Sequence, residues 1–250
     1  MAASLSVTVI TRNAADQLAA CLESIQFADD IVVVDCGSKD ATIEIAQRHR
    51  ARVLHQDWLG YGRQKQFAVM QARHPWVLCV DADERVSDEL RASIQSMLAA
   101  PKFQAYRMPR RNRFMGRWLH HGEGYPDWSL RLFHRDAANW SDDAIHEKVV
   151  ARTAVGTLTG DLLHESEVGI ADYLAKQNRY TTLQAQTLHA RGKRVGALRM
   201  LLSPVFRFIK FYFLRLGLLD GIPGLVHISI GCFNTFIKYA KLRELQQRGR

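Results

Sequence analysis

Residues 77–90 read VLCVDADERVSDEL, so a run of apolar residues is followed at once by several acidic ones. Residues 77–80 have the composition of a buried strand, and Asp81, Asp83 and Glu84 come directly after it. Carboxylates at the exit of a buried strand repel one another and resist desolvation. We therefore expect a positively charged group to lie between them.

The strand before these carboxylates is the fourth in a regular series of strands and helices. Apolar, β-branched runs predict strands, and apolar residues at helical spacing predict helices. The expected strands are residues 5–10, 31–34, 52–55 and 76–80. The expected helices between them are residues 13–25, 41–48 and 63–73. This series indicates an α/β fold with a mostly parallel sheet, in which ligands bind at the carboxyl ends of the strands.

Asp35 and Asp81 stand at two such strand ends, and Asp83 follows two residues after Asp81. Mg²⁺ and Mn²⁺ prefer oxygen ligands and often take few from the protein and the rest from phosphate and water. Asp81 and Asp83 therefore predict a site for a metal-bound diphosphate. A solvated turn is the alternative, but the buried strand before the pair and the position of Asp35 favour the metal site. Ser87 is expected to cap the helix that follows.

The second half of the chain changes character twice. Residues 103–155 are β-like and rich in Arg, His and Trp, which indicates a second half-sheet that shapes a pocket. From about residue 173 the pattern returns to helix. We expect a catalytic domain over residues 1–172 and a helical region over residues 173–250.

The helical region contains an apolar stretch, residues 198–219, that is interrupted by basic residues. These charges argue against a helix that spans a membrane. Residues 221–237 contain Pro223 and three glycines and are shorter than the roughly 20 residues that a crossing needs. Basic residues beside large apolar ones suit an interfacial helix pair on anionic lipid, with the basic end KLRELQQRGR adding attraction. An ordinary core-facing helical hairpin is the alternative.

Composition sets limits on the partners and the compartment. The 250 residues are 47% hydrophobic, which is enough for a packed core, and the net charge of +9 predicts anionic partners. Four cysteines (Cys21, Cys36, Cys79, Cys232) lie in apolar surroundings without CxxC spacing, so we expect buried thiols in a reducing compartment. The N-terminus has no basic leader, and we expect a cytoplasmic protein.

Five motifs together resemble family 2 glycosyltransferases, which have the GT-A fold and use nucleotide sugars. Four of them, in order, are VTVITRN (7–13), IVVVDCGSKDAT (31–42), RQKQFAV (63–69) and VLCVDADE (77–84). The fifth, GRWLHHGEGYPDWSLRLFHRDAANWSDDAIHEKV (116–149), is similar to the subgroup that contains the lipopolysaccharide core β-glucosyltransferases. The resemblance covers nearly the whole chain.

The resemblance implies roles for residues at the strand ends. Thr11 and Asp35 would lie at the base and ribose of the nucleotide, while Asp81 and Asp83 would hold the ribose and the metal-bound diphosphate. Lys65 would neutralise phosphate, unless it lies on a solvated helix face. Cys36 departs from the family, in which many members have a second Asp, and this leaves open whether Asp35 takes over base recognition.

The resemblance also implies a base. An inverting transfer needs a group that takes the proton of the acceptor hydroxyl, and a carboxylate is the usual choice. AIHEKV matches the place of the acid pair of the family, which makes Glu147 the first candidate and Asp143 the second. His146 would orient Glu147 or contact the leaving diphosphate.

Other basic and aromatic residues are candidates for phosphate and sugar binding. Arg131 and a basic cluster could bind the leaving diphosphate or a phosphorylated acceptor through charge-assisted hydrogen bonds. The cluster is Arg110, Arg111, Arg113, Arg117, His120 and His121. Trp118, Tyr125 and Trp128 could stack on sugars, although core packing is the more common role of such aromatics.

We therefore expect an inverting, Mg²⁺- or Mn²⁺-dependent glycosyltransferase. The resemblance implies transfer of a hexose, glucose from UDP-glucose first, to a heptose of the lipopolysaccharide inner core at the cytoplasmic face of the inner membrane. Another phosphorylated or lipid-linked cell-surface glycan is the alternative acceptor. An aspartyl-phosphate phosphatase is disfavoured because Arg85 stands where such enzymes have Thr or Val. A nucleic-acid-binding protein is disfavoured because no groove-reading helix or basic aromatic face is evident.

Overall fold

The computed structural model describes residues 2–142, 147–165 and 169–248, and the chain forms two compact units. The first unit consists of Met1–Arg110 and Trp128–Glu165, and the second of Arg111–Asp127 and Ser166–Arg250. Residues 111–127 belong to the second unit, although the sequence pattern placed them in the first domain.

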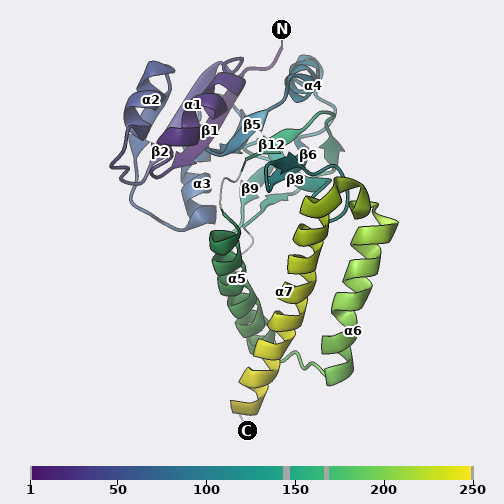
Figure 1. The fold of residues 1–250 in the computed structure, drawn as a ribbon. Coiled ribbons are helices and arrows are strands. Elements are labelled where there is room, and N and C mark those ends of the chain that lie inside the picture. The colour runs from purple at the N-terminus through teal and green to yellow at the C-terminus, as the bar shows by residue number, and fades with distance from the viewer. Residues whose placement is uncertain (1, 143–146, 166–168, 249–250) are drawn as a thin grey trace. The chain divides into compact units, whose positions relative to one another are not determined.

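The first unit begins with the expected series of strands and helices (Figure 1). In chain order they are β1 (Leu5–Thr11), α1 (Ala15–Ser24), β2 (Asp30–Asp35), α2 (Thr42–Arg48), β3 (Arg52–His55), α3 (Tyr61–Met70) and β4 (Trp76–Asp81). The four strands are parallel, in the order β3-β2-β1-β4. Thr11 pairs with Asp35, and Ile10 pairs with Asp81, so these residues lie at one edge of the sheet.

The sheet continues beyond β4 with strands of mixed direction. The remaining elements of this part are β5 (Glu84–Val86), α4 (Asp88–Ala99), β6 (Ala105–Phe114), β8 (Asp127–His134), β9 (Ala138–Trp140), β10 (Val149–Ala151), β11 (Val155–Thr157) and β12 (Leu162–His164). β8 runs antiparallel to β4, and the order continues β8-β6-β12-β5. The predictions of an α/β fold with a largely parallel central sheet and of a β-rich second half are confirmed.

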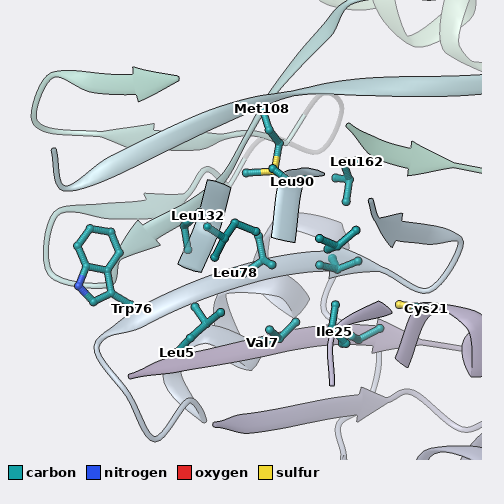
Figure 2. Packing of buried hydrophobic residues seen from close by; sticks show 14 of the residues in the cluster. Leu5, Val7, Cys21, Ile25, Trp76, Leu78, Leu90, Met108, Leu132 and Leu162 are labelled. Carbon is teal, nitrogen blue, oxygen red and sulfur yellow. The ribbon is translucent and has the colours of Figure 1, made fainter. Parts of the chain in front are cut away.

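The core of this unit explains why its central strands are apolar throughout. Figure 2 shows Leu5 and Val7 of β1, Leu78 of β4 and Leu132 of β8 in one buried cluster with side chains of the neighbouring helices. A parallel strand covered on both faces needs apolar residues at successive positions. Helix α4 closes the cluster, and its start is fixed by Ser87, whose Oγ accepts a hydrogen bond from the Leu90 amide at 3.2 Å, as predicted.

The described residues of the second unit are mostly helical. They also include β7 (Arg117–Trp118), which pairs antiparallel with the end of β6. The helices of this unit are α5 (Ile170–Ala190), α6 (Ala197–Phe208), the π-helical turn η1 (Ile209–Leu214), the 3-10 turn η2 (Gly217–Asp220) and α7 (Gly221–Arg248). Helix α7 packs against both α5 and α6 and lies between them in Figure 1. The C-terminal helices are therefore present as expected.

In the described part of the chain, no single helix combines the length and apolar composition needed to cross a membrane. The pair Ala197–Leu214 and Gly217–Gln247, bent by 75°, meets that requirement only when both are taken together.

The four cysteines are free thiols, as expected, but their burial differs. Cys21 and Cys79 are buried, whereas Cys36 and Cys232 are only partly covered. Burial and the charges of nearby carboxylates raise the pKa of Cys21, which keeps it a neutral thiol.

The buried carboxylate of Asp30 contributes to the stability of the sheet. It accepts hydrogen bonds from Arg52 Nε at 2.8 Å, Ser6 Oγ at 2.9 Å and the Arg73 amide at 3.1 Å, which joins the first three strands. Burial alone would raise the pKa of Asp30, but these hydrogen bonds outweigh it and lower the pKa. The stabilisation is therefore present above the unfolded-state pKa of about 3.9 and is lost as pH falls through the lower folded-state pKa.

We predict that Asp30→Asn lowers the free energy of unfolding at pH 7 by about 1.5–3 kcal/mol, the range for hydrogen bonds to a charged group. Urea unfolding at a series of pH values should also show a shallower loss of stability toward acid than in the wild type. The control is Asp57→Asn, because the Asp57 side chain is 94% exposed. Parallel acid profiles for Asp30→Asn and the wild type would contradict the prediction.

Candidate functional site

Asp81, at the end of β4, lies between two cationic side chains. Lys65 on α3 places its Nζ 2.9 Å from Asp81 Oδ1, and Arg131 on β8 places Nη2 2.8 Å from Asp81 Oδ2. The side chains of Lys65 and Arg131 are 7% and 6% exposed. The positive partner expected for the carboxylates of residues 81–84 is therefore supplied, at Asp81, by the protein itself.

These charges keep Asp81 ionised. Burial alone would raise the pKa of Asp81, but the charges and hydrogen bonds of Arg131 and Lys65 hold it far below the ordinary carboxyl range. In the same way, burial would lower the pKa of Arg131, but Asp81 and Glu84 raise it. Asp81 and Arg131 therefore remain charged at neutral pH.

Glu84 provides a second carboxylate at this strand end, and its side chain is fully buried. Its Oε1 accepts hydrogen bonds from Arg131 at 3.1 Å and from Arg110 at 3.3 Å, and its Oε2 accepts one from the Asp81 amide at 2.9 Å. Arg131 and Arg110, both expected at phosphate, thus have carboxylate partners here. Arg131 bridges Asp81 and Glu84 and so fixes the end of β4.

Trp140 on β9 lies against both cations. Its ring centroid is 4.7 Å from Lys65 Nζ and 5.3 Å from Arg131 Cζ, and its Nε1 donates to Cys79 Sγ at 3.4 Å. A buried indole face stabilises a nearby cation. Sequence analysis missed Trp140, because only the fold brings β9 to α3 and β8.

Glu147, the first candidate for the base, reaches the same cluster. Its Oε1 is 3.4 Å from Lys65 Nζ, and its side chain is 21% exposed. Gly62 lets Ser141 of the same segment approach α3, since a Cβ at residue 62 would lie 2.1 Å from the carbonyl oxygen of Ser141. The other two catalytic candidates, Asp143 and His146, lie outside the described residues.

Asp83 has different surroundings from Asp81. Its Oδ2 is 3.2 Å from Nε2 of His164, and the two side chains are 33% and 20% exposed. β12 brings His164 there by pairing with β5, so that His164 stands opposite Glu84. His164 was missed by sequence analysis, because its segment, GDLLHES, carries no recognisable motif and lies 81 residues from Asp83.

Asp83 and His164 are candidate ligands of a divalent metal ion, and metal binding here, like that expected of Asp81, stays a prediction. Both oxygens of Asp81 contact cations, whereas the carboxylate of Asp83 and the imidazole of His164 face each other on a partly exposed edge. Among the described residues, no three His, Cys, Asp or Glu side chains are grouped to hold a metal. An ion at Asp83 would therefore complete its shell with diphosphate and water oxygens, as Mg²⁺ commonly does.

Thr11 and Asp35 form a separate polar group at the ends of β1 and β2. Asp35 is buried and accepts from Thr11 Oγ1 at 3.1 Å, from the Gly37 and Ser38 amides at 2.8 Å each, and from Ser38 Oγ. These hydrogen bonds lower the pKa of Asp35 although burial opposes them. Its carboxylate shapes the loop after β2, and nucleotide recognition by Thr11 and Asp35 stays a prediction.

The rest of the basic and aromatic candidates divide between the units. Arg110 and Trp128 belong to the first unit, where Arg107 covers the exposed Trp128 ring at 4.7 Å. The others belong to the second unit: Arg111, Arg113, Arg117, Trp118, His120, His121 and Tyr125. There the amides of His120 and His121 donate to the buried Asp220 at 3.1 and 2.9 Å. Phosphate or sugar binding by these residues stays a prediction.

Comparison with known proteins gives a consistent result. The family model described as "Glycosyl transferase family 2" matches residues 6–157. A lipopolysaccharide core biosynthesis glycosyltransferase, LpsC of Rhizobium meliloti, is 32% identical over 95% of this chain and 91% of its own length. An uncharacterized glycosyltransferase of Rickettsia typhi is 30% identical over 98% of this chain and 89% of its own length.

The fold comparison agrees with the sequence comparison. The crystal structure of S. aureus TarS superposes with a TM-score of 0.50 and 14% identity, over 95% of this chain and 55% of TarS. At that identity the likeness supports the fold alone, which is the GT-A type expected from the sequence motifs. On the evidence of the family model and of LpsC, this chain belongs to glycosyl transferase family 2.

Proposed function

We propose that this glycosyltransferase transfers a hexose, with inversion, from a nucleotide sugar to a heptose of the lipopolysaccharide inner core. UDP-glucose is the proposed donor. The proposed location is the cytoplasmic face of the inner membrane, where the enzyme would bind a lipid-linked acceptor. The 32% identity to LpsC over 95% of the chain supports the acceptor class. The convergence of Lys65, Asp81, Arg131 and Glu147 at one strand edge is the observation that carries the chemistry.

A divalent ion held by Asp83 and His164 would supply Lewis-acid stabilisation of the departing nucleotide diphosphate. Arg131 and Lys65 are proposed to have different roles. Arg131 is fixed by Asp81 and Glu84 and acts as a positioning residue. Lys65 has a flexible stem and a compact charge, so it can exchange a carboxylate partner for a diphosphate oxygen.

Glu147 is proposed as the general base. Its carboxylate can accept the proton of the acceptor hydroxyl as that oxygen attacks the anomeric carbon from the face opposite the leaving diphosphate. Lys65 holds the carboxylate at 3.4 Å and so orients it before the acceptor arrives. Asp143 and His146 remain proposed as an alternative base and an orienting residue.

The experiment that tests this function is thermal unfolding with Mn²⁺ and UDP, GDP, dTDP or CMP in turn, followed by transfer assays. A ligand that binds only the folded state stabilises it by about 2.7 kcal/mol at a concentration 100 times Kd. We expect a Mn²⁺-dependent rise in Tm that is selective for UDP. Product from UDP-glucose on a heptose-containing core acceptor, measured by mass spectrometry, would then support the full proposal. Transfer only to another glycan would retain the enzyme class and reject the acceptor.

We predict that Asp83→Asn lowers kcat/KM for transfer by at least about a hundredfold, the scale for losing one charge-stabilising contact in the transition state. The increase in Tm with UDP should no longer depend on Mn²⁺. The fold should remain intact, because Asp83 is partly exposed, and unfolding without ligand reports this. Asp136→Asn is the control, since its side chain is 82% exposed. Near-normal turnover of Asp83→Asn would reject the metal role.

We predict that Glu147→Gln lowers kcat by about 10²–10⁴-fold, the usual contribution of a general base. The increase in Tm with UDP and Mn²⁺ should be retained, because the variant keeps the shape of the donor site. The control is Asp142→Asn, an exposed carboxylate of the same segment. A loss of kcat in Asp142→Asn equal to that in Glu147→Gln would point to disturbance of the segment and contradict the assignment of the base.

A further inference from the structure

The second unit exposes an unusual amount of apolar surface in one segment. Among the described residues, 26 large hydrophobic side chains are exposed, and 13 of them lie between residues 198 and 225. Phe206 is 67% exposed and Leu214 75% exposed. So many exposed apolar side chains within one short segment of a folded protein mark an interaction site.

The exposed side chains follow a helical stripe along α6 and η1. Leu198, Leu202, Val205, Phe206, Ile209 and Phe213 are exposed at spacings of three and four residues. A surface helix in water shows the opposite arrangement, with its apolar stripe toward the protein and its polar residues outward. In Figure 1, α6 lies along α7, on the side of α7 away from α5. The stripe is therefore not the face that α6 uses to pack on α7.

Two basic residues of this segment, Arg207 and Arg215, are turned inward. Arg207 forms an ion pair with Glu123 and donates to Thr235 Oγ1 at 3.3 Å. Arg215 donates to the carbonyl oxygen of Tyr125 at 3.3 Å. Two of the four basic residues that interrupt residues 198–219 thus hold the unit together, which leaves the outer face largely apolar.

The positive charge of the chain is concentrated in the helical region that carries this face. Residues 169–250 contain 14 Lys and Arg against three Asp and Glu, whereas residues 1–168 contain 20 against 22. A second copy of the chain would bring two strongly positive surfaces together, which disfavours association. An anionic bilayer surface offers the opposite charge together with an apolar interior.

We propose that the exposed face of α6, η1 and η2 docks the protein on the surface of an anionic bilayer. The apolar stripe enters the boundary between head groups and acyl chains, while Arg199 and Lys210 reach the anionic head groups, as in interfacial amphipathic helices. The 75° bend between the two helical segments suits a contact that lies in the interface. This docking deepens the proposed function, because a lipid-linked acceptor is met only at a bilayer.

The test is flotation of the full chain with vesicles of phosphatidylcholine alone or mixed with phosphatidylglycerol, without any substrate. We expect binding to the mixed vesicles, weaker binding to the neutral ones, and a decrease with added salt as charges are screened. Phe206→Ser and Leu214→Ser should each weaken partitioning by about tenfold, the effect of removing one buried apolar side chain. Met70→Ser is the matched control, since Met70 in the first unit is also 67% exposed.

Three outcomes would overturn the docking proposal. One is absence of flotation with mixed vesicles, and another is equal flotation of wild type, Phe206→Ser and Leu214→Ser. The third is a concentration-dependent dimer in sedimentation velocity that Phe206→Ser abolishes, without vesicle binding, which would assign the face to a second copy of the chain. The Tm response to UDP and Mn²⁺ is measured on the same variants, so failure of docking and failure of the glycosyltransferase proposal are separate results.

Discussion

The ion pairs of Asp81 with Lys65 and Arg131 are the interactions on which the candidate site depends. They join the end of β4 to the preceding helix, α3, and to β8, whose Arg131 lies 50 residues farther along the chain. Burying a carboxylate costs several kcal/mol unless cations and hydrogen bonds compensate it, and removing one partner leaves an uncompensated buried charge. The position of Glu147 depends on the same lysine. The site is therefore pre-organised by charge balance among its own residues.

The parts of the fold that sequence reasoning predicted are those that local patterns determine. Apolar runs marked β1, β2 and β4, and Ser87 marked the start of α4, because burial and capping act within a few residues. Lys65 and Asp81 were singled out as well, although their direct contact was not foreseen. His164 and Trp140 were missed because each reaches the site only through strand pairing or packing over long sequence separations. No local property of their segments encodes those partners.

The helical unit shows a second limit on what sequence patterns predict. The spacing of apolar residues in 198–219 is the same for a helix that faces a core and for one that faces lipid, so sequence periodicity left both possibilities open. The structure distinguishes the two faces, because Arg207 and Arg215 point to partners within the unit while Phe206 and Leu214 are exposed. Arg207 and Arg215, which in the sequence seemed to interrupt an apolar helix, instead mark its inner side.

Net charge conveys little about the candidate site itself. The overall value of +9 combines residues 1–168, in which acidic side chains slightly outnumber basic ones, with residues 169–250, in which 14 of 17 charged residues are basic. Within the site, Arg131 and Arg110 already have carboxylate partners, so an incoming diphosphate must compete for Lys65 or bring a metal ion with it. Attraction of an anionic donor would then be a local exchange of partners. The charge surplus of residues 169–250 would act over a longer distance, as the proposed docking on an anionic bilayer requires.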